Sequence, residues 1–296
     1  MKPPAFDYHD PNSVEGALEL LAEHGDEAKV LAGGQSLVPL LNFRLARPEH
    51  LIDINRVGEL AGISREGGVL RIGAMTRQST MERSQLVAGN WPLLAEALSY
   101  VAHAQIRNRG TVGGSVAHAD PAAELPVALL TLDASFLVRS RRGERRIPAS
   151  DFFVTHLTTA LEPDEMLVEI AVPPPAAGSG SAFTEFSRRH GDFALGGASV
   201  VLESDGAGIC TSAAVGLLAA APTPLRAAAA ERELVGSKID GEAAAAASKA
   251  VEGIEPTGDI HGSSEYRKGV IEVMVRRAII AAAKRTGGAP AGASQN

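Results

Sequence analysis

The sequence predicts an α+β protein of two domains, and three observations support this prediction. The chain has 296 residues, which is longer than one average domain, and its hydrophobic content of 45% is ample for a sizeable core. Stretches with helical periodicity and stretches with strand character both occur along it. The prolines and small residues of "PPPAAGSGS", residues 173–181, favour extended or flexible chain. We therefore predict domains at 1–177 and 178–286, followed by a disordered tail at 287–296.

The first part of the chain begins with alternating helix and strand signals. "SVEGALELLAEHG" has one apolar helical stripe, with Ser13 as a cap and Gly25 as a stop. "AKVLAG" then predicts a buried strand, "LVPLLNFRL" one or two helical turns, and "EHLIDINRV" another strand. Further on we expect a strand in "VLRIGA", a short helix in "TRQSTMERS", and a longer helix in "WPLLAEALSYVA", where Pro92 suits the first turn.

The same helix and strand signals predict the elements from residue 120 onward. In "DPAAELPVALLTLDA" we expect a helix with Asp120 as N-cap and Pro121 in the first position. "ASFLVRSRRGERRIP" predicts a hairpin with a solvated tip, and "EMLVEIAVP" a closing strand. The second domain is expected to contain strands in "SAFTEFSRR", "ALGGASVVLE" and "GICTSAAVGLLA", then alanine-rich helices and the long helix "SEYRKGVIEVMVRRAIIAAAKR".

The totals exclude several classes of function. The 28 basic and 35 acidic residues give a net charge of -7, which argues against nucleic acid as a partner. We find no signal peptide and no apolar stretch long enough to span a bilayer, so we expect a cytoplasmic protein. Cys210 is the only cysteine, which excludes an all-cysteine iron-sulfur or zinc site within the chain.

Two glycine pairs carry the chemical signal, in "KVLAGGQSLVPLL" and in "RNRGTVGGSVAHADPAAELP". Glycine lets the backbone approach a ligand closely, and consecutive amides can point together at an anion such as a diphosphate. Ser36 adds a hydroxyl to the first segment, and Thr111 and Ser115 flank the glycines of the second. Either pair alone could simply make a tight turn. Neither has the spacing of a Rossmann fingerprint or the lysine of a P-loop, which disfavours a nicotinamide-type Rossmann enzyme.

These segments resemble the flavin-binding medium subunit of molybdenum hydroxylases, the family that includes the medium chain of carbon monoxide dehydrogenase. The resemblance rests on "AGGQSLVPLLNFRLARPEHLIDIN", "IGAMTR", "IRNRGTVGGSVAHADPAAELP", and "DEMLVEIAVP" followed by "RRHGDFALGGASV". It extends from "FDYHDPNSVEGALELL" to the last long helix. It implies a two-lobed FAD-binding domain of the PCMH/vanillyl-alcohol-oxidase type, with lobes at about 1–57 and 58–177, plus a smaller C-terminal α+β domain.

The resemblance also implies which residues surround a non-covalent FAD. The two glycine segments would hold the diphosphate and the adjacent ribose from opposite sides, and other residues would contact the sugar or ribityl part and the ring. Asp120 could equally be a helix cap only, and Phe193 in "GDFAL" could be an ordinary core residue. Glu124 stands where relatives often have aspartate. The implied set is Val30, Leu31, Ala32, Gly33, Gly34, Gln35, Ser36, Leu37, Val101, Thr111, Val112, Gly113, Gly114, Ser115, Asp120, Glu124, Leu167 and Phe193.

Two further features indicate contacts and roles that we do not expect. Thr184 stands where some purine-oxidising relatives have a lysine, so that contact is not available. The histidines at 103, 118 and 190 have no catalytic partner visible in the sequence, and we expect them on the surface or behind the contacting residues.

The resemblance implies an oxidoreductase subunit that transfers electrons. FAD would pass electrons from [2Fe-2S] clusters on a small partner subunit to an external acceptor, while the molybdenum cofactor would lie on a large partner subunit. Two such heterotrimers would form a dimer. The chain itself would need no catalytic side chain and no metal. Two alternatives are a stand-alone flavin oxidase and a non-catalytic scaffold that has lost FAD.

Overall fold

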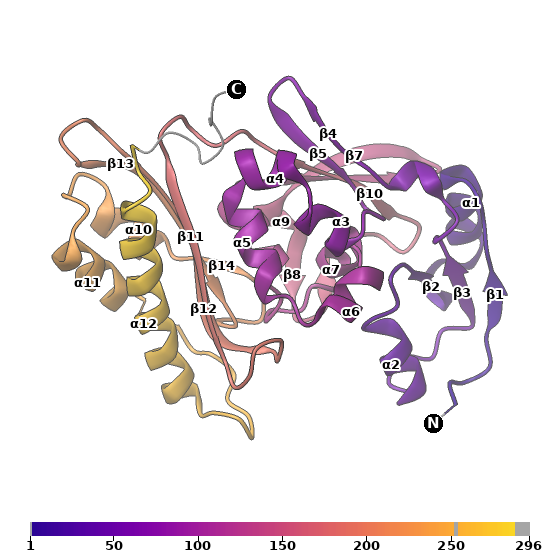
Figure 1. Ribbon diagram of the computed structural model, residues 1–296. Coiled ribbons are helices and arrows are strands. Elements are labelled where there is room, and N and C mark those ends of the chain that lie inside the picture. The colour runs from indigo at the N-terminus through magenta and orange to yellow at the C-terminus, as the bar shows by residue number, and fades with distance from the viewer. Residues whose placement is uncertain (1, 252–253, 288–296) are drawn as a thin grey trace.

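The N-terminal lobe is a small parallel sheet with one helix packed against it (Figure 1). The computed structural model describes residues 2–251 and 254–287. Strands β1 (Asp7–His9), β3 (His50–Asp53) and β2 (Ala28–Leu31) are neighbours in that order, and both pairs are parallel. Helix α1 (Val14–His24) buries one apolar stripe against Ile52. As predicted, the Ser13 hydroxyl caps this helix, and Gly25, with φ of 49°, ends it. The short helices η1 (Gly25–Glu27) and α2 (Leu37–Asn42) complete the lobe.

A five-stranded antiparallel sheet forms the centre of the molecule. Its order is β4 (Ile63–Glu66), β5 (Val69–Gly73), β10 (Met166–Val172), β6 (Ser135–Ser140) and β7 (Gly143–Pro148). Helices cover it and share its main apolar core, in which Trp91, Leu94 and Phe136 are fully buried. These elements are η2 (Gly58–Leu60), α3 (Gln78–Glu82), α4 (Gln85–Asn90), α5 (Pro92–Tyr100), α6 (Ala104–Arg109), α7 (Val112–His118), α8 (Glu124–Thr131) and α9 (Ala149–Phe152), with strands β8 (Phe153–Thr155) and β9 (Thr158–Thr159).

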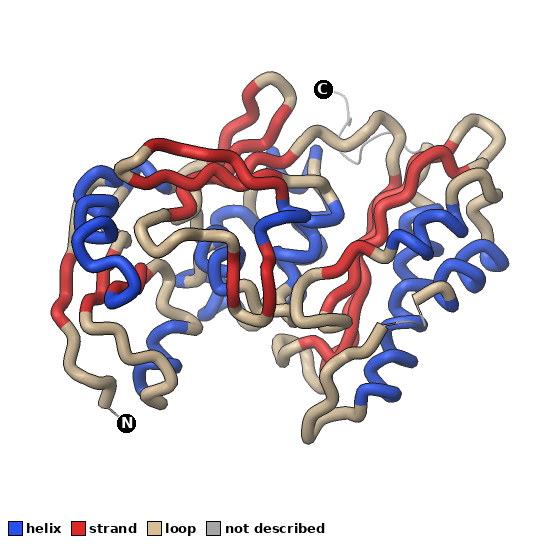
Figure 2. Tube along the Cα trace, turned by 180° about the vertical axis from the view of Figure 1, so that it is seen from behind, coloured by secondary structure: helices blue, strands red, loops and turns tan. Residues whose placement is uncertain are grey.

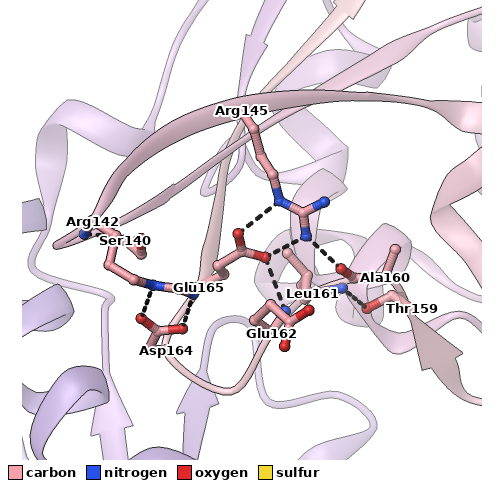
Figure 3. Close-up of polar contacts among 9 residues, drawn as sticks. All are labelled: Ser140, Arg142, Arg145, Thr159, Ala160, Leu161, Glu162, Asp164 and Glu165. Atoms are coloured by element: carbon pink, nitrogen blue, oxygen red, sulfur yellow. Dashed lines mark hydrogen bonds and ion pairs between the residues drawn. The ribbon is translucent and has the colours of Figure 1, made fainter.

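The tip of the β6–β7 hairpin is exposed to solvent, as predicted, and two of its arginines form ion pairs there. Arg142 pairs with Asp164 at 2.6 Å, and Arg145 pairs with Glu165 at 2.7 Å and donates to the carbonyl of Ala160 (Figure 3). The hydrogen bonds from Arg145 hold the pKa of Glu165 below its usual value. These contacts fix the turn at 159–165, which leads directly into β10.

The C-terminal part is a four-stranded antiparallel sheet between two sets of helices (Figures 1 and 2). Its strands are β11 (Gly180–Ser187), β12 (Ala194–Ser204), β13 (Cys210–Leu218) and β14 (Leu225–Arg226). Helices α10 (Ala228–Leu234), α11 (Gly241–Lys249) and α12 (Ser264–Ala283) cover one face, and α5 and α8 contact the sheet from the central part. Glu96 of α5 joins the parts, because its carboxylate accepts from the Phe183 amide and from Arg285.

Two predicted features near the second glycine pair are wrong. Helix α8 begins at Glu124 with Ala123 as N-cap, and Asp120 instead accepts from the amide of Ala122 at 2.8 Å in the preceding turn. The glycine pair itself belongs to a helix, α7, for which Thr111 is the N-cap. The remainder of the predicted tail, 288–296, lies outside the described residues. None of the described helices is both long and apolar enough to cross a membrane.

Candidate cofactor-binding site

The first glycine segment leaves β2 and turns sharply before α2. Gly34 has φ of 74°, in the left-handed region that favours glycine, and its carbonyl accepts from the amide of Val38 at 3.2 Å. Among the described residues, no acceptor pairs with the backbone amides of residues 33–36. The Ser36 hydroxyl makes no capping bond to α2 either. This turn therefore presents donors that suit an anionic group.

The second glycine segment is built differently. The amide of Val112 donates to Thr76 at 2.9 Å, and that of Gly113 to Ala74 at 2.9 Å. The amides of Gly114 and Ser115 donate to the side chain and the carbonyl of Thr111. The expectation that both segments offer free amides in the same manner is therefore wrong for the second, because its amides already have acceptors within the chain.

The fold brings the two glycine segments into contact. A Cβ atom at Gly33 would overlap the carbonyl oxygen of Arg109 and lie 2.8 Å from the Cα of Gly110. A Cβ atom at Gly114 would lie 3.5 Å from the Cβ of Ala32 and even closer to the Thr111 hydroxyl. Both segments therefore form parts of one wall, and the small size of these residues permits the close approach.

A chain of polar contacts, which the sequence reasoning missed, joins the two segments. The Asn55 side chain donates to the carbonyl of Ala32 at 2.7 Å and accepts from Arg77 at 2.7 Å. Arg77 also donates to the carbonyl of Arg109. The strand order could have indicated Asn55, because loops that follow neighbouring parallel strands lie at the same sheet edge. Asn55 follows β3, and the first glycine segment follows β2.

A cavity of about 190 Å³ opens beside this chain of contacts. Burial, followed by the like charge of Arg109, lowers the pKa of Arg77, while the charge of Asp53 acts in the opposite direction. Burial alone would raise the pKa of Asp53, but hydrogen bonds from Tyr8 and Asn55 outweigh it and keep the carboxylate ionised. The free amides and Arg109 on the cavity wall suit a diphosphate. The lining residues are Leu31, Ala32, Gly33, Gly34, Gln35, Val38, Asp53, Asn55 and Arg109.

Two carboxyl groups with raised pKa values lie outside the lining of this cavity. Glu124, at the start of α8, is 8% exposed, and burial raises its pKa to about 7, with a smaller contribution from Asp120. Burial also raises the pKa of Glu185 on β11 to about 8, and the charge of Glu124 adds to the shift. The charge of Glu124 in the central part therefore acts on the carboxyl group of Glu185 in the C-terminal part.

The remaining predicted residues lie in different surroundings. Val101 and Leu167 are buried in the main core, where Leu167 faces Val138 of β6. Phe193 is 75% exposed, so the alternative that it is an ordinary core residue is wrong. Its turn lies near Val101, because a Cβ at Gly191 would contact His103 and the carbonyl of Ala102.

The sequence predicts no catalytic role for Thr184 or for the histidines at 103, 118 and 190. Thr184 donates to the carbonyl of Met274 at 2.9 Å, so its hydroxyl is used within the C-terminal part. The histidines at 103 and 190 are exposed, and burial lowers the pKa of the half-buried His118.

Two family models cover most of the chain. Residues 4–175 match the FAD binding domain in molybdopterin dehydrogenase, and residues 181–282 match the CO dehydrogenase flavoprotein C-terminal domain. The alpha subunit of the 6-hydroxypseudooxynicotine dehydrogenase complex of Paenarthrobacter nicotinovorans is 50% identical, over 96% of this chain and 97% of the relative.

Solved structures agree in fold over nearly all of the chain. A structure of carbon monoxide dehydrogenase from Hydrogenophaga pseudoflava, which lacks the Mo-pyranopterin moiety, superposes with a TM-score of 0.94 and 44% identity, covering 97% of this chain and all of that one. Quinoline 2-oxidoreductase from Pseudomonas putida 86 gives a TM-score of 0.91 and 41% identity, covering 96% and 99%. The chain therefore belongs to the FAD-binding medium-subunit family of the molybdenum hydroxylases, of the carbon monoxide dehydrogenase type, and is an oxidoreductase subunit that binds FAD.

Proposed function

We propose that this chain relays electrons within a carbon monoxide dehydrogenase-like complex, from [2Fe-2S] clusters on a small partner subunit to an external acceptor. The observation that carries the site assignment is the meeting of the two glycine segments beside the Asn55–Arg77 contacts. The residues with free amides and Arg109 line one small cavity there. FAD, when bound, would supply a group that accepts electrons singly or in pairs.

Different residues of the site would contact different parts of FAD. The amides of 33–36 and the Ser36 hydroxyl would bind the diphosphate, with the charge of Arg109 on the cavity wall. The second segment would contribute its hydroxyl groups and a close-fitting backbone rather than an amide cradle. Asp120 and Glu124 would contact the sugar or ribityl part, and Val101, Leu167 and Phe193 would lie toward the ring. With the proposed domains at 1–177 and 178–286, the cavity would lie between the two lobes of the first domain, since its lining comes from residues 31–55 and from Arg109.

The partners follow from the same proposal. Cys210 is the only cysteine of the chain and is buried, so iron-sulfur clusters must be held elsewhere. A large partner subunit would bind the molybdenum cofactor and oxidise the substrate. We propose a dimer of heterotrimers in the cytoplasm. This chain would therefore bind and orient FAD and keep water from the ring, without a nucleophile or general base of its own.

Purification of the chain, alone and with its partner subunits, tests this proposal. We expect one FAD per chain, released by acid precipitation because it is not covalently bound, and no stoichiometric iron or molybdenum in the isolated chain. In the complex, reduction of the partner's clusters should be followed by reduction of the flavin. A folded chain without affinity for FAD would indicate the scaffold alternative. Turnover of a small substrate by the isolated flavoprotein would indicate the stand-alone oxidase.

A further inference from the structure

Three histidines from three separate elements meet in the N-terminal lobe. His9 ends β1, His24 ends α1, and His50 begins β3. One ring nitrogen of each can be chosen so that all three lie within 4.8 Å of one another. Nε2 of His9 is 3.2 Å from Nδ1 of His50, and the rings of His24 and His50 are stacked at a centroid distance of 3.6 Å.

The fold places this cluster on the face of the sheet that α1 covers. Side chains alternate between the two faces of a strand, so His50 shares a face with Ile52, which packs against α1. His9 pairs in register with Ile52, which brings it to the same region. Asp53, beside the candidate cofactor site, points to the opposite face. The cluster is therefore separate from the residues proposed to bind FAD.

We propose that His9, His24 and His50 bind one late first-row divalent metal ion, such as Zn²⁺. Neutral imidazole nitrogens are the ligands that such ions favour. Two nitrogens bound to one tetrahedral zinc at 2.0–2.1 Å would be about 3.4 Å apart. The 3.2 Å between His9 and His50 is close to this separation. All three side chains are half-buried, which limits their mobility and leaves a path for the ion.

The electrostatic surroundings favour a cation. His24 lies at the carboxyl end of the 11-residue helix α1, where the helix dipole is negative. Carboxylate oxygens of Glu27 and Glu49 can lie within 4.8 Å of each other and of a ring nitrogen of His50. Water or one of these carboxylates can complete a tetrahedral set. The ion would join β1, α1 and β3, whose mutual packing otherwise depends on a small apolar core.

Zinc binding by the full-length, untagged chain tests this inference. After treatment with a chelator and dialysis, Zn²⁺ is titrated in a calorimeter into the native chain and into His9→Gln and His24→Gln. His156→Gln, which changes an exposed histidine outside the cluster, is the matched control. FAD content and the unfolding transition of each variant report whether the fold is retained. Co²⁺ in place of Zn²⁺ gives a visible spectrum that reports the ligand geometry.

We expect one Zn²⁺ per chain in the native protein and in His156→Gln. The affinity for Zn²⁺ should be at least tenfold weaker in His9→Gln and in His24→Gln than in the native chain. The Co²⁺ spectrum of the native chain should be that of a tetrahedral site. FAD content should stay unchanged in all of them, which separates this result from any failure of the FAD assignment. Absence of stoichiometric binding to the folded native chain would overturn the proposal and leave the rings as a stacked, hydrogen-bonded cluster. Equal affinity in the native chain and in the cluster variants would also overturn it.

Discussion

Replacement of Gly33 by alanine tests how closely the two glycine segments must approach. Gly33 does not have a positive φ, so the added methyl group acts through space alone. The new Cβ would lie 2.8 Å from the Cα of Gly110, whereas ordinary contact begins at 3.4 Å. The segments must therefore separate by about 0.6 Å, the difference between these two distances, and by more at the carbonyl of Arg109.

The size of the effect follows from the cost of overpacking, which is roughly 1–3 kcal/mol. The first segment can relieve this strain in the free protein by moving away from Arg109, but it must return to bind FAD. Since about 1.4 kcal/mol corresponds to a tenfold change in affinity, we expect the FAD dissociation constant to rise about 5- to 150-fold. Titration of the apoprotein with FAD, followed by flavin fluorescence, measures this constant.

Gly89→Ala is the matched control. A Cβ at Gly89, within α4, would meet nothing within 4 Å, so the same substitution adds no overlap there. The control should bind FAD as the native chain does and can gain up to about 1 kcal/mol in stability through helix propensity. If Gly33→Ala were folded and bound FAD with a dissociation constant within twofold of the control, close approach of the two segments would not be needed for binding.

Two further predictions concern single side chains. Burial raises the pKa of Glu185 from 4.5 to about 8. Between pH 4.5 and pH 8 the folded chain therefore keeps a proton on this carboxyl group that the unfolded chain loses. The contribution of Glu185 to stability falls as the pH rises through this range. Glu185→Gln should therefore flatten the decline in unfolding free energy from pH 5 to pH 8, measured by urea denaturation; parallel curves for both proteins would contradict the burial argument. Phe193→Ala should change stability by less than about 0.5 kcal/mol, because the side chain is 75% exposed, yet alter flavin potential or reoxidation in the complex. Unchanged potential and reoxidation in rapid-mixing experiments would remove Phe193 from the ring's surroundings.

Local signals predicted most of the elements. Helix α1 has an apolar stripe, a serine cap and a terminal glycine that agree with one another, so its bounds could be predicted from sequence. Asp120 and Pro121 carry an equally good start signal, but the chain makes a turn there and α8 begins later. Glu124, the first residue of α8, is only 8% exposed, and a local capping rule does not take such burial into account.

The site could be predicted only where one stretch of sequence carries it. The first glycine pair follows a recognisable strand, and its role depends on a positive φ at Gly34. Strand order brings Asn55 to the first segment, and an isolated bridge to Thr111 brings Arg77 to the second. A local sequence pattern contains neither arrangement. The histidine cluster is likewise a product of tertiary structure, since its three members come from three elements.

The unequal use of backbone amides on the two sides of the site has a kinetic consequence. Amides at 112–115 have acceptors within the chain, so they should exchange slowly with deuterated solvent whether FAD is present or absent. The amides of 33–36 have none and should become protected only on binding. We therefore expect the second segment to keep one backbone conformation with and without FAD. The apparent affinity for FAD depends on the fraction of time that the first turn spends in its binding conformation. Substitutions that make this turn more rigid should therefore tighten FAD binding without adding a contact.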